Sequence, residues 1–137
     1  MKYDGQNIFA KIIRGELPAE RVYEDELNIV IMDIMPRSDG HILVLPKSSC
    51  RNILDANTVQ LNSCIQLVQR MSKAVREAFN AEGVTIQQFN EAAGGQEVFH
   101  LHFHVLPRYA GIALRPPGKM EDPTILEENC KKIKAAI

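Results

Sequence analysis

The chain has 137 residues, of which 45% are hydrophobic and 24% are charged. This size and composition are typical of one globular domain with its own core, and they exclude disordered and low-complexity classes. Lysine and arginine number 16 against 17 aspartate and glutamate residues, which gives a formal net charge of -1. The charge balance excludes a broad basic surface for nucleic acid, so any phosphate ligand must be held by local geometry.

The three cysteines, Cys50, Cys64 and Cys130, are odd in number and form no Cys-x-x-Cys pair. They therefore predict neither a disulfide framework nor a zinc ribbon. No apolar run approaches the roughly 20 residues of a membrane helix, and the first residues are polar. We expect a cytoplasmic protein with reduced thiols and with neither a membrane nor a nucleic acid as partner.

The first part of the chain predicts a short helix followed by strands. Residues 8–13 place apolar side chains on one helical face, with Asn7 as the cap and Gly15 as the end. Three short runs rich in β-branched and large apolar residues, separated by turn sequences, then predict consecutive antiparallel strands at residues 21–24, 29–33 and 41–45.

The second part predicts a long helix, two strands and a last helix. Apolar residues recur at three- and four-residue intervals from about Asn57 to Glu82, and Gly83 follows as a stop. A last helix opens at Asp122 with Pro123 in its first turn. The predicted strands are residues 84–90 and 98–106, joined by a glycine-containing loop at residues 91–97.

This order of elements predicts an α+β fold with an antiparallel sheet. No internal repeat or linker divides the chain, apart from a proline and glycine cluster at residues 115–118. We therefore expect one domain over residues 1–137, with a core at about 7–108 and a C-terminal extension that carries the last helix at about 109–137.

The last predicted strand carries three of the four histidines within a span of five residues, namely His100, His102 and His104. Because side chains on a strand alternate, these three share one face, with neighbours roughly 6.5 to 7 Å apart. A row of imidazoles is costly to bury unless it serves chemistry or binds a metal. The alternate positions Phe99, Leu101, Phe103 and Val105 are predicted to face the core.

Two interpretations of the histidine row are open. Neutral imidazoles at alternate positions can chelate zinc and leave one coordination position for water. Alternatively, one imidazole attacks an electrophile while its neighbours bind the anion. Gly94 and Gly95, just before the strand, allow backbone N–H groups to converge on an anion, although a simple turn accounts for two glycines equally well. A phosphate site beside the row favours the nucleophile.

The segment resembles the His-x-His-x-His signature of the histidine triad (HIT) nucleotide hydrolases and transferases. The resemblance is closest to the Hint-like branch, whose members are single-domain homodimers that join two five-stranded sheets. It implies a HIT-like fold and a homodimer, in which the partner is a second copy of this chain. Other matching segments are Asn7 to Glu16 with Pro18, Asp33-Ile34 with Pro36, Gly40 to Lys47, and Asn90 with Gly95-Gln96.

In this family the middle histidine is the nucleophile, which implies that His102 attacks the α-phosphorus of a nucleoside 5'-phosphate derivative. The implied intermediate is a nucleotidyl-histidine that water then cleaves. The backbone carbonyl of His100 would hold the other ring N–H of His102. The resemblance also implies that His104 binds the phosphoryl oxygens and the leaving group, and that His41 steadies the His100 end of the array.

The resemblance further implies a set of nucleotide-binding residues. Asp33 matches the position that holds the ribose hydroxyls, and Asn90 matches a polar residue near the ribose and phosphate. The backbone of Gly95, Gln96 and Glu97 would cradle the phosphate. The implied apolar walls of the base pocket are Ile8, Phe9, Ile12, Ile34 and Leu43, and Val98 joins the nucleotide-binding set.

Two positions depart from the family pattern. Glu97 stands where Hint-branch proteins often have a small hydroxyl residue near the leaving group, and a carboxylate there repels a phosphate unless it turns outward or meets a cationic leaving group. Asn7 and Ala10 replace the two cysteines through which some bacterial relatives bind structural zinc. We therefore expect that zinc site to be absent. Because imidazolium and backbone N–H groups can stabilise the phosphoryl oxygens without a metal, we also expect no metal and no cofactor in the triad.

The resulting hypothesis is a hydrolase of purine nucleoside phosphoramidates or related nucleotidyl compounds that releases a nucleoside 5'-monophosphate. Cleavage of dinucleoside polyphosphates is the alternative within the same class. A zinc-binding metalloprotein and a nucleotide-binding scaffold without phosphoryl chemistry are the alternatives from other classes.

Overall fold

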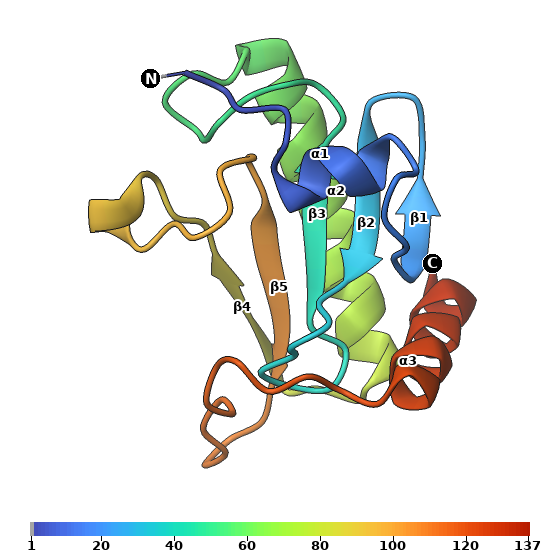
Figure 1. Ribbon diagram of the computed structural model, residues 1–137. Helices are drawn as coiled ribbons and strands as arrows, with labels where there is room; N and C mark the ends of the chain where they lie inside the picture. Colours follow the sequence, from blue (N-terminus) through green and yellow to red (C-terminus); the bar gives the residue numbers. More distant parts are fainter. Residues whose placement is uncertain (1) are drawn as a thin grey trace.

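Five short segments form one antiparallel sheet in the computed structural model, which describes residues 2–137 (Figure 1). The strand order is β1-β2-β3-β5-β4. This confirms the predicted α+β class and the predicted five-stranded antiparallel sheet. The strands are β1 (Arg21–Glu24), β2 (Asn28–Met32), β3 (Ile42–Pro46), β4 (Gly83–Gln87) and β5 (Phe103–Arg108).

The helices begin where the sequence predicts them. The Asn7 side chain accepts the backbone N–H of Ala10 at 2.9 Å and caps α1 (Ile8–Ile13). The Asp122 side chain accepts the N–H of Thr124 at 2.8 Å and caps α3 (Pro123–Ala136). The long helix is α2 (Thr58–Ala78), and a short 3-10 helix, η1 (Ala92–Gly94), lies in the loop before β5.

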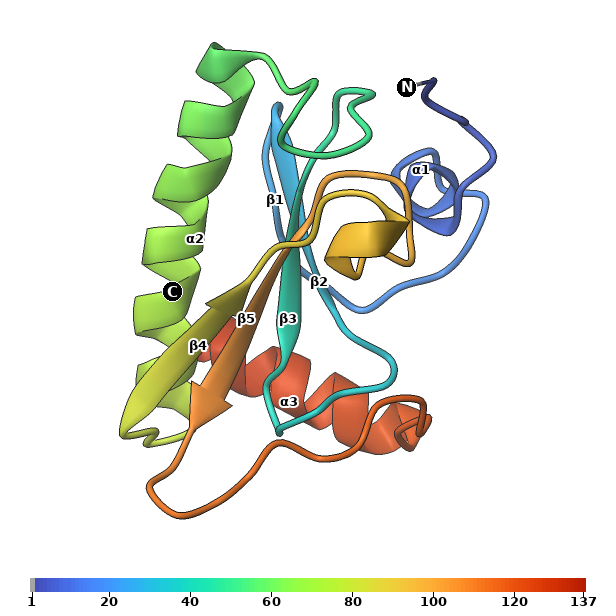
Figure 2. The same cartoon turned by 90° about the vertical axis from the view of Figure 1, so that its left-hand side faces the viewer.

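The central strands β2 and β3 are buried at every position. Figure 2 shows α2 on one side of the sheet and α1 on the other. Alternate residues of the central strands, such as Val30 and Val44, pack with α2 and α3. The residues between them, such as Ile31 and Leu43, pack with Phe9 of α1 in a second cluster. Because both faces are covered, the central strands are apolar at almost every position. The α1 face, shared with the loop before β5, is the face that carries the polar site.

Several predicted boundaries are wrong, and the strand predicted at residues 84–90 ends at Gln87. The long helix ends at Ala78 rather than near Gly83, because Asn80 adopts a left-handed backbone conformation, φ 47°, that breaks the helical path, and Gly83 opens β4. The last strand begins at Phe103 instead of residue 98, and it continues through Pro107, which is in register with Val84 of β4.

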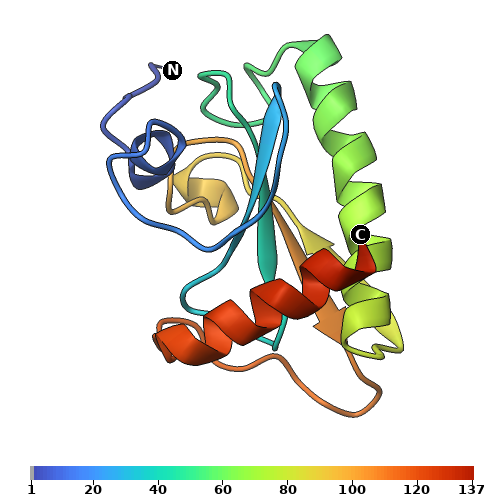
Figure 3. The same ribbon diagram turned by 90° about the vertical axis from the view of Figure 1, so that its right-hand side faces the viewer.

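The C-terminal segment packs back onto the rest of the structure. After β5 the chain runs across one end of the sheet, and α3 packs on α2 and β1 (Figure 3). Leu126, Cys130 and Ile133 of α3 belong to the main core. The three cysteines are buried free thiols, and within residues 2–137 no helix is both long and apolar enough to cross a membrane.

Candidate active site

Two neighbouring strands bring histidines together. His104 lies on β5 in register with Leu43 of β3, and His41 directly precedes β3. The turn into β3 needs Gly40, whose φ is 87° and whose place would not admit a side chain, because a Cβ would collide with the Phe79 ring. The Nε2 atom of His41 therefore lies 2.9 Å from Nδ1 of His104.

This contact corrects the expected place of His41. The family resemblance puts His41 at the His100 end of the array, whereas the structure puts it against His104. The reason is the strand register, because His41 precedes β3 and lies at the level where β3 pairs with β5. His100 lies near the other end of β3, where it binds the carbonyl of Pro46.

The predicted alternation holds for part of the histidine segment. His102 and His104 line one cavity, and their ring centroids are 5.1 Å apart. His100 does not line the cavity and is 1% exposed. Phe99 also departs from the prediction, because it lies before the strand begins and packs under the guanidinium of Arg51 at 4.2 Å. The residues found in the opposite core, as predicted, are Leu101, Phe103 and Val105.

Hydrogen bonds assign the protons of His100 and His102. The Nε2 atom of His100 lies 2.8 Å from the carbonyl oxygen of Pro46, so it donates, and Nδ1 accepts the hydroxyl of Tyr3 at 2.6 Å. The Nδ1 atom of His102 donates to the carbonyl of His100 at 2.6 Å. The Nε2 atom of His102 keeps its lone pair and has no hydrogen-bond partner among residues 2–137. An imidazole in this state is a nucleophile.

The same reasoning assigns His41 and His104. The Nδ1 atom of His41 accepts the backbone N–H of Arg37 at 3.1 Å, so neutral His41 carries its proton on Nε2. That proton points to Nδ1 of His104, which leaves the proton of His104 on Nε2. The cavity is therefore lined by an unprotonated nitrogen of His102 and a residue, His104, that has an N–H donor to offer.

Burial keeps these histidines neutral. Loss of solvation is the largest cause in each case, and it lowers the pKa of His41 and His104 to about 3 and the pKa of His100 to about 4. Burial also lowers the pKa of His102, although the bond to the His100 carbonyl opposes this shift. After burial, the positive charge of Arg37 is the next cause for His41. Neutral imidazoles are the state that a nitrogen nucleophile requires.

A cavity of about 770 Å³, within the range of small-molecule sites, opens beside His102 and His104. The Phe9 ring of α1 meets His102 edge-on, with ring centroids 4.8 Å apart. Phe89 meets His104 in the same manner at 5.8 Å. The predicted nucleotide-binding residues that line the cavity are Ile8, Phe9, Ile12, Asp33, Ile34, Leu43, Gly95, Glu97 and Val98.

Asp33 follows β2, and its carboxylate lies against His41 and His104. Its Oδ2 atom is 3.4 Å from Nε2 of His41 and 4.0 Å from Nδ1 of His104. Its Oδ1 atom accepts the backbone N–H of Met35 at 2.8 Å. The carboxylate is thus oriented by the turn after β2, and its expected contact with ribose remains a prediction.

Asp33, His41 and His104 also place one potential metal ligand each within 4.8 Å of one another. A histidine and carboxylate set of this kind suits Zn²⁺ in principle. Coordination through Nε2 of His41 would, however, move its proton to Nδ1, where it would face the N–H of Arg37 instead of accepting it. These residues therefore fit a hydrogen-bonded pair better than a metal site.

A buried amide holds the glycine-containing loop. Gln96 is 4% exposed, and its Oε1 atom accepts the backbone N–H of Glu91 at 2.8 Å and the side chain of Asn52 at 3.1 Å. Its Nε2 atom donates to the carbonyls of Arg51 at 2.7 Å and Val98 at 3.0 Å. Gln96 does not line the cavity, so its side chain shapes the loop that Gly95 and its neighbours present there.

Asn90 does not line the cavity either. Its Oδ1 atom accepts the backbone N–H of Ile53 at 2.9 Å and the amide of Gln88 at 2.9 Å, and its Nδ2 atom donates back to Gln88 at 2.9 Å. The Asn90 side chain thus forms hydrogen bonds within the protein, and its contact with a nucleotide remains a prediction.

Several residues of the site carry no signal in the sequence. Arg37 and Tyr3 stand alone in polar segments, with nothing to indicate that one lines the cavity and the other binds His100. Gln87 is opposite His104 in the sheet, and Phe89 packs on the same ring. Gln87 and Phe89 both lie in the strand predicted at residues 84–90. That they reach the cavity follows only from the register of Gln87 with His104 and from the ring contact of Phe89.

Comparisons with known proteins agree with this geometry. A family model described as the HIT domain matches residues 14–111. The crystal structure of a Hit-like protein involved in cell-cycle regulation from Bartonella henselae, solved with an unknown ligand, has a TM-score of 0.97, 55% identity and 100% coverage of both chains.

Two curated relatives have named activities. Adenosine 5'-monophosphoramidase hnt1 of Schizosaccharomyces pombe is 32% identical over 101 residues, which cover 74% of this chain and 73% of that protein. Adenylylsulfatase HINT3 of Arabidopsis thaliana is 35% identical over 101 residues, which cover 74% of this chain and 51% of that protein. With its family model matched over most of its length, the chain belongs to the HIT family.

Proposed function

We propose that this HIT-family hydrolase cleaves the bond between the α-phosphorus of a purine nucleoside 5'-phosphate derivative and its leaving group, releasing a nucleoside 5'-monophosphate. Phosphoramidates and related nucleotidyl compounds are the substrate class. The observation that carries the proposal is the state of His102, whose Nδ1–H is held by a backbone carbonyl at 2.6 Å while its Nε2 atom has no partner.

The reaction proceeds in two displacements at phosphorus. The lone pair on Nε2 of His102 forms a bond to the α-phosphorus as the bond to the leaving group breaks, and the leaving group departs with that electron pair and takes a proton from water. A water molecule then attacks the phosphorus of the nucleotidyl-histidine. The phosphorus–nitrogen bond breaks, its electron pair returns to Nε2, and the proton of the water is released.

The remaining residues bind and orient the substrate. The Nε2–H of His104 donates to the phosphoryl oxygens and the leaving group, and such donors are worth most where charge develops in the transition state. The backbone at Gly95 binds the phosphate. The apolar wall that includes Phe9 receives the base, and the carboxylate of Asp33 accepts hydrogen bonds from the ribose hydroxyls.

The leaving group is the open part of the proposal. The two named relatives differ in this respect, one being a monophosphoramidase and the other an adenylylsulfatase. Dinucleoside polyphosphates are the second candidate class, because the half-buried guanidinium of Arg37 lines the cavity and favours an anionic substrate.

We include a cytoplasmic homodimer in the proposal. The edge strand β4 leaves one side of its backbone unpaired by the sheet, and Ile86 on it is 46% exposed. An exposed apolar edge strand is a surface that a second chain can extend. The oligomeric state, measured by light scattering, tests this part separately from the chemistry.

The test of the function is turnover of adenosine 5'-phosphoramidate and of diadenosine polyphosphates by the purified protein, with and without a chelator. We expect release of AMP that a chelator does not reduce. Tight nucleotide binding without turnover would instead favour the scaffold. Stoichiometric zinc together with loss of activity on chelation would favour the metalloprotein.

A further inference from the structure

Arg37 is a cation without a partner beside the reacting groups. It lies on the turn between β2 and β3, is half-buried, and lines the same cavity as His102 and His104. No carboxylate forms an ion pair with it among residues 2–137. Partial burial of a charge is costly unless an opposite charge compensates it, so an unpaired guanidinium in a cavity indicates an anionic ligand.

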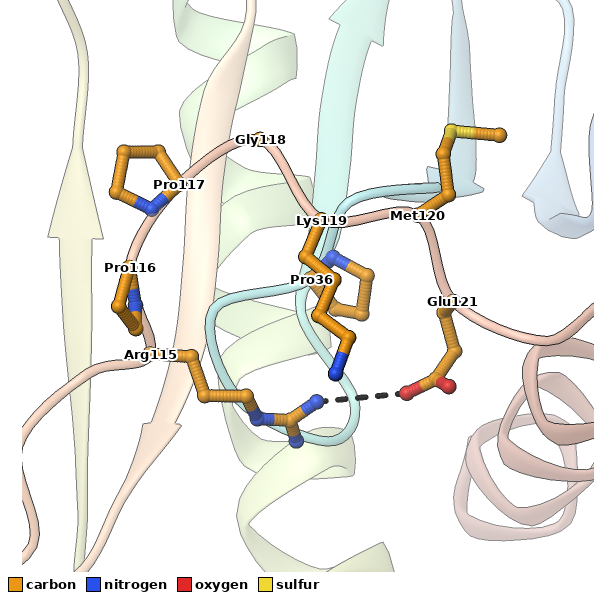
Figure 4. Close-up of a pocket in the computed structure, with 8 residues that line it drawn as sticks. All are labelled: Pro36, Arg115, Pro116, Pro117, Gly118, Lys119, Met120 and Glu121. Atoms are coloured by element: carbon orange, nitrogen blue, oxygen red, sulfur yellow. Dashed lines mark hydrogen bonds and ion pairs between the residues drawn. The ribbon is translucent and has the colours of Figure 1, made fainter.

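The C-terminal extension holds this side chain in place. Nε of Arg37 donates to the carbonyl of Arg115 at 2.8 Å, and the backbone N–H of Arg115 donates to the carbonyl of Arg37 at 2.9 Å. The guanidinium of Arg115 forms an ion pair with Asp39 at 2.5 Å. It forms a second ion pair with Glu121 at 3.4 Å (Figure 4). The two arginines therefore differ, since Arg115 serves the structure and Arg37 keeps its terminal N–H groups free.

A series of contacts joins Arg37 to the histidines of the cavity. From the apolar wall, ring centroids step from Phe9 to His102 by 4.8 Å, to His104 by 5.1 Å and to His41 by 5.2 Å. The backbone of Arg37 then contacts His41 at 3.1 Å. Arg37 is thus joined through His41 to His104, the residue proposed to bind the leaving group.

The carboxylates of the cavity do not cancel this charge. Asp33 lies against His41 and His104 instead of Arg37. Glu97 is exposed on the loop before β5, where water screens its charge. A planar guanidinium with free N–H groups matches the paired oxygens of a phosphate or sulfate, which an amine leaving group does not offer.

We propose that Arg37 binds an anionic leaving group, a phosphate or sulfate carried by the α-phosphorus, so that the enzyme accepts such substrates in addition to the phosphoramidates. The inference rests on the proposed function and defines the substrate class within it. Arg37 is then a specificity residue, held in position by the carbonyl of Arg115.

The kinetic test compares adenosine 5'-phosphosulfate, which has an anionic leaving group, with adenosine 5'-phosphoramidate. We expect Arg37→Gln to lower kcat/KM for the phosphosulfate about 10- to 100-fold, the range of one charge-assisted hydrogen bond, and to change that for the phosphoramidate less than about threefold. Arg37→Lys should recover part of the loss. Lys119→Gln removes the same charge from an exposed position and should leave both values unchanged. An equal loss on both substrates, or no loss, overturns the inference.

A binding test makes the answer independent of turnover. Titration calorimetry compares AMP with the α,β-methylene analogue of ADP, whose second phosphate occupies the leaving-group position. We expect the wild-type protein to bind the diphosphate analogue more tightly, and Arg37→Gln to remove that difference while AMP binds as before. If Arg37 shows this effect but neither substrate is cleaved, the proposed function fails and the anion site stands. Equal wild-type affinities, or no nucleotide binding, overturn the anion site.

Discussion

The two ends of the histidine array are held by different kinds of group. At one end, His100 and His102 donate to the backbone carbonyls of Pro46 and His100. At the other end, His104 accepts from a side chain, His41, which in turn accepts the backbone N–H of Arg37. The fold itself thus orients the nucleophile, whereas a chain of side chains and a turn orients the donor on the leaving-group side.

Low pH should give the largest effect on stability, because protonation acts on histidines at both ends of the array. The folded-state pKa values of His41 and His104, about 3, and of His100, about 4, lie below the ordinary 6.5, so below pH 6.5 the unfolded chain binds protons that the folded chain does not. The contribution of these groups to stability is complete above that pH. Below it, the free energy of unfolding should fall by up to about 4 kcal/mol per pH unit near pH 5.

Urea unfolding at pH 8, 6 and 5 measures this dependence. A steep loss below pH 6.5 would show that both ends of the array are buried and neutral. A free energy of unfolding that stays constant from pH 7 to 5 would contradict this interpretation. A slope one third as steep as expected would mean that only one of the three histidines is buried and neutral.

Substitution of His104 tests the role of the hydrogen-bond donor separately from that of the nucleophile, His102. We expect His104→Ala to lower kcat about 10²- to 10³-fold, as the loss of one transition-state donor does, without unfolding the chain. His104→Gln keeps an N–H group at this position and should recover at least about tenfold of that loss. Steady-state kinetics with circular dichroism as the folding control tests this pair. Equal rates for the two variants would mean that His104 does not act as a donor.

The loop beside the array should show a smaller effect, on stability. Gln96→Leu leaves the polar groups that Gln96 now bonds, among them the N–H of Glu91 and the carbonyl of Arg51, without their partner, and it should lower the free energy of unfolding by about 2–3 kcal/mol. Gln88→Leu, at a half-buried amide bonded to Asn90, is the matched control and should cost less than about 1 kcal/mol. Urea titration compares the two variants. Similar losses in the free energy of unfolding would contradict the role of Gln96 in holding the loop.

Local features of the sequence predicted much of the fold. Asn7 and the Asp122-Pro123 pair mark helix starts because a cap acts on N–H groups two or three residues away. The spacing of His102 and His104 likewise predicts a shared cavity face, because alternation is a property of one strand.

Contacts that depend on register were not predictable from the sequence. His41 meets His104 instead of His100 because of how β3 pairs with β5. Arg37 lines the cavity and donates to the carbonyl of Arg115 in the C-terminal extension, far away in sequence. Gly83 looks like a helix stop, but Asn80 breaks the helix first through its left-handed backbone. Each of these features joins segments that no local pattern connects.

The most direct test of the central claim is to identify the atom that carries the nucleotide during turnover. A rapid acid-free quench with adenosine 5'-phosphoramidate, followed by peptide mass spectrometry, should find an adenylyl group on His102 in the wild-type protein and in His104→Ala, and none in His102→Gly. An adduct on His104 or His41, or a His102→Gly variant that retains more than a few per cent of the wild-type rate, would contradict the account.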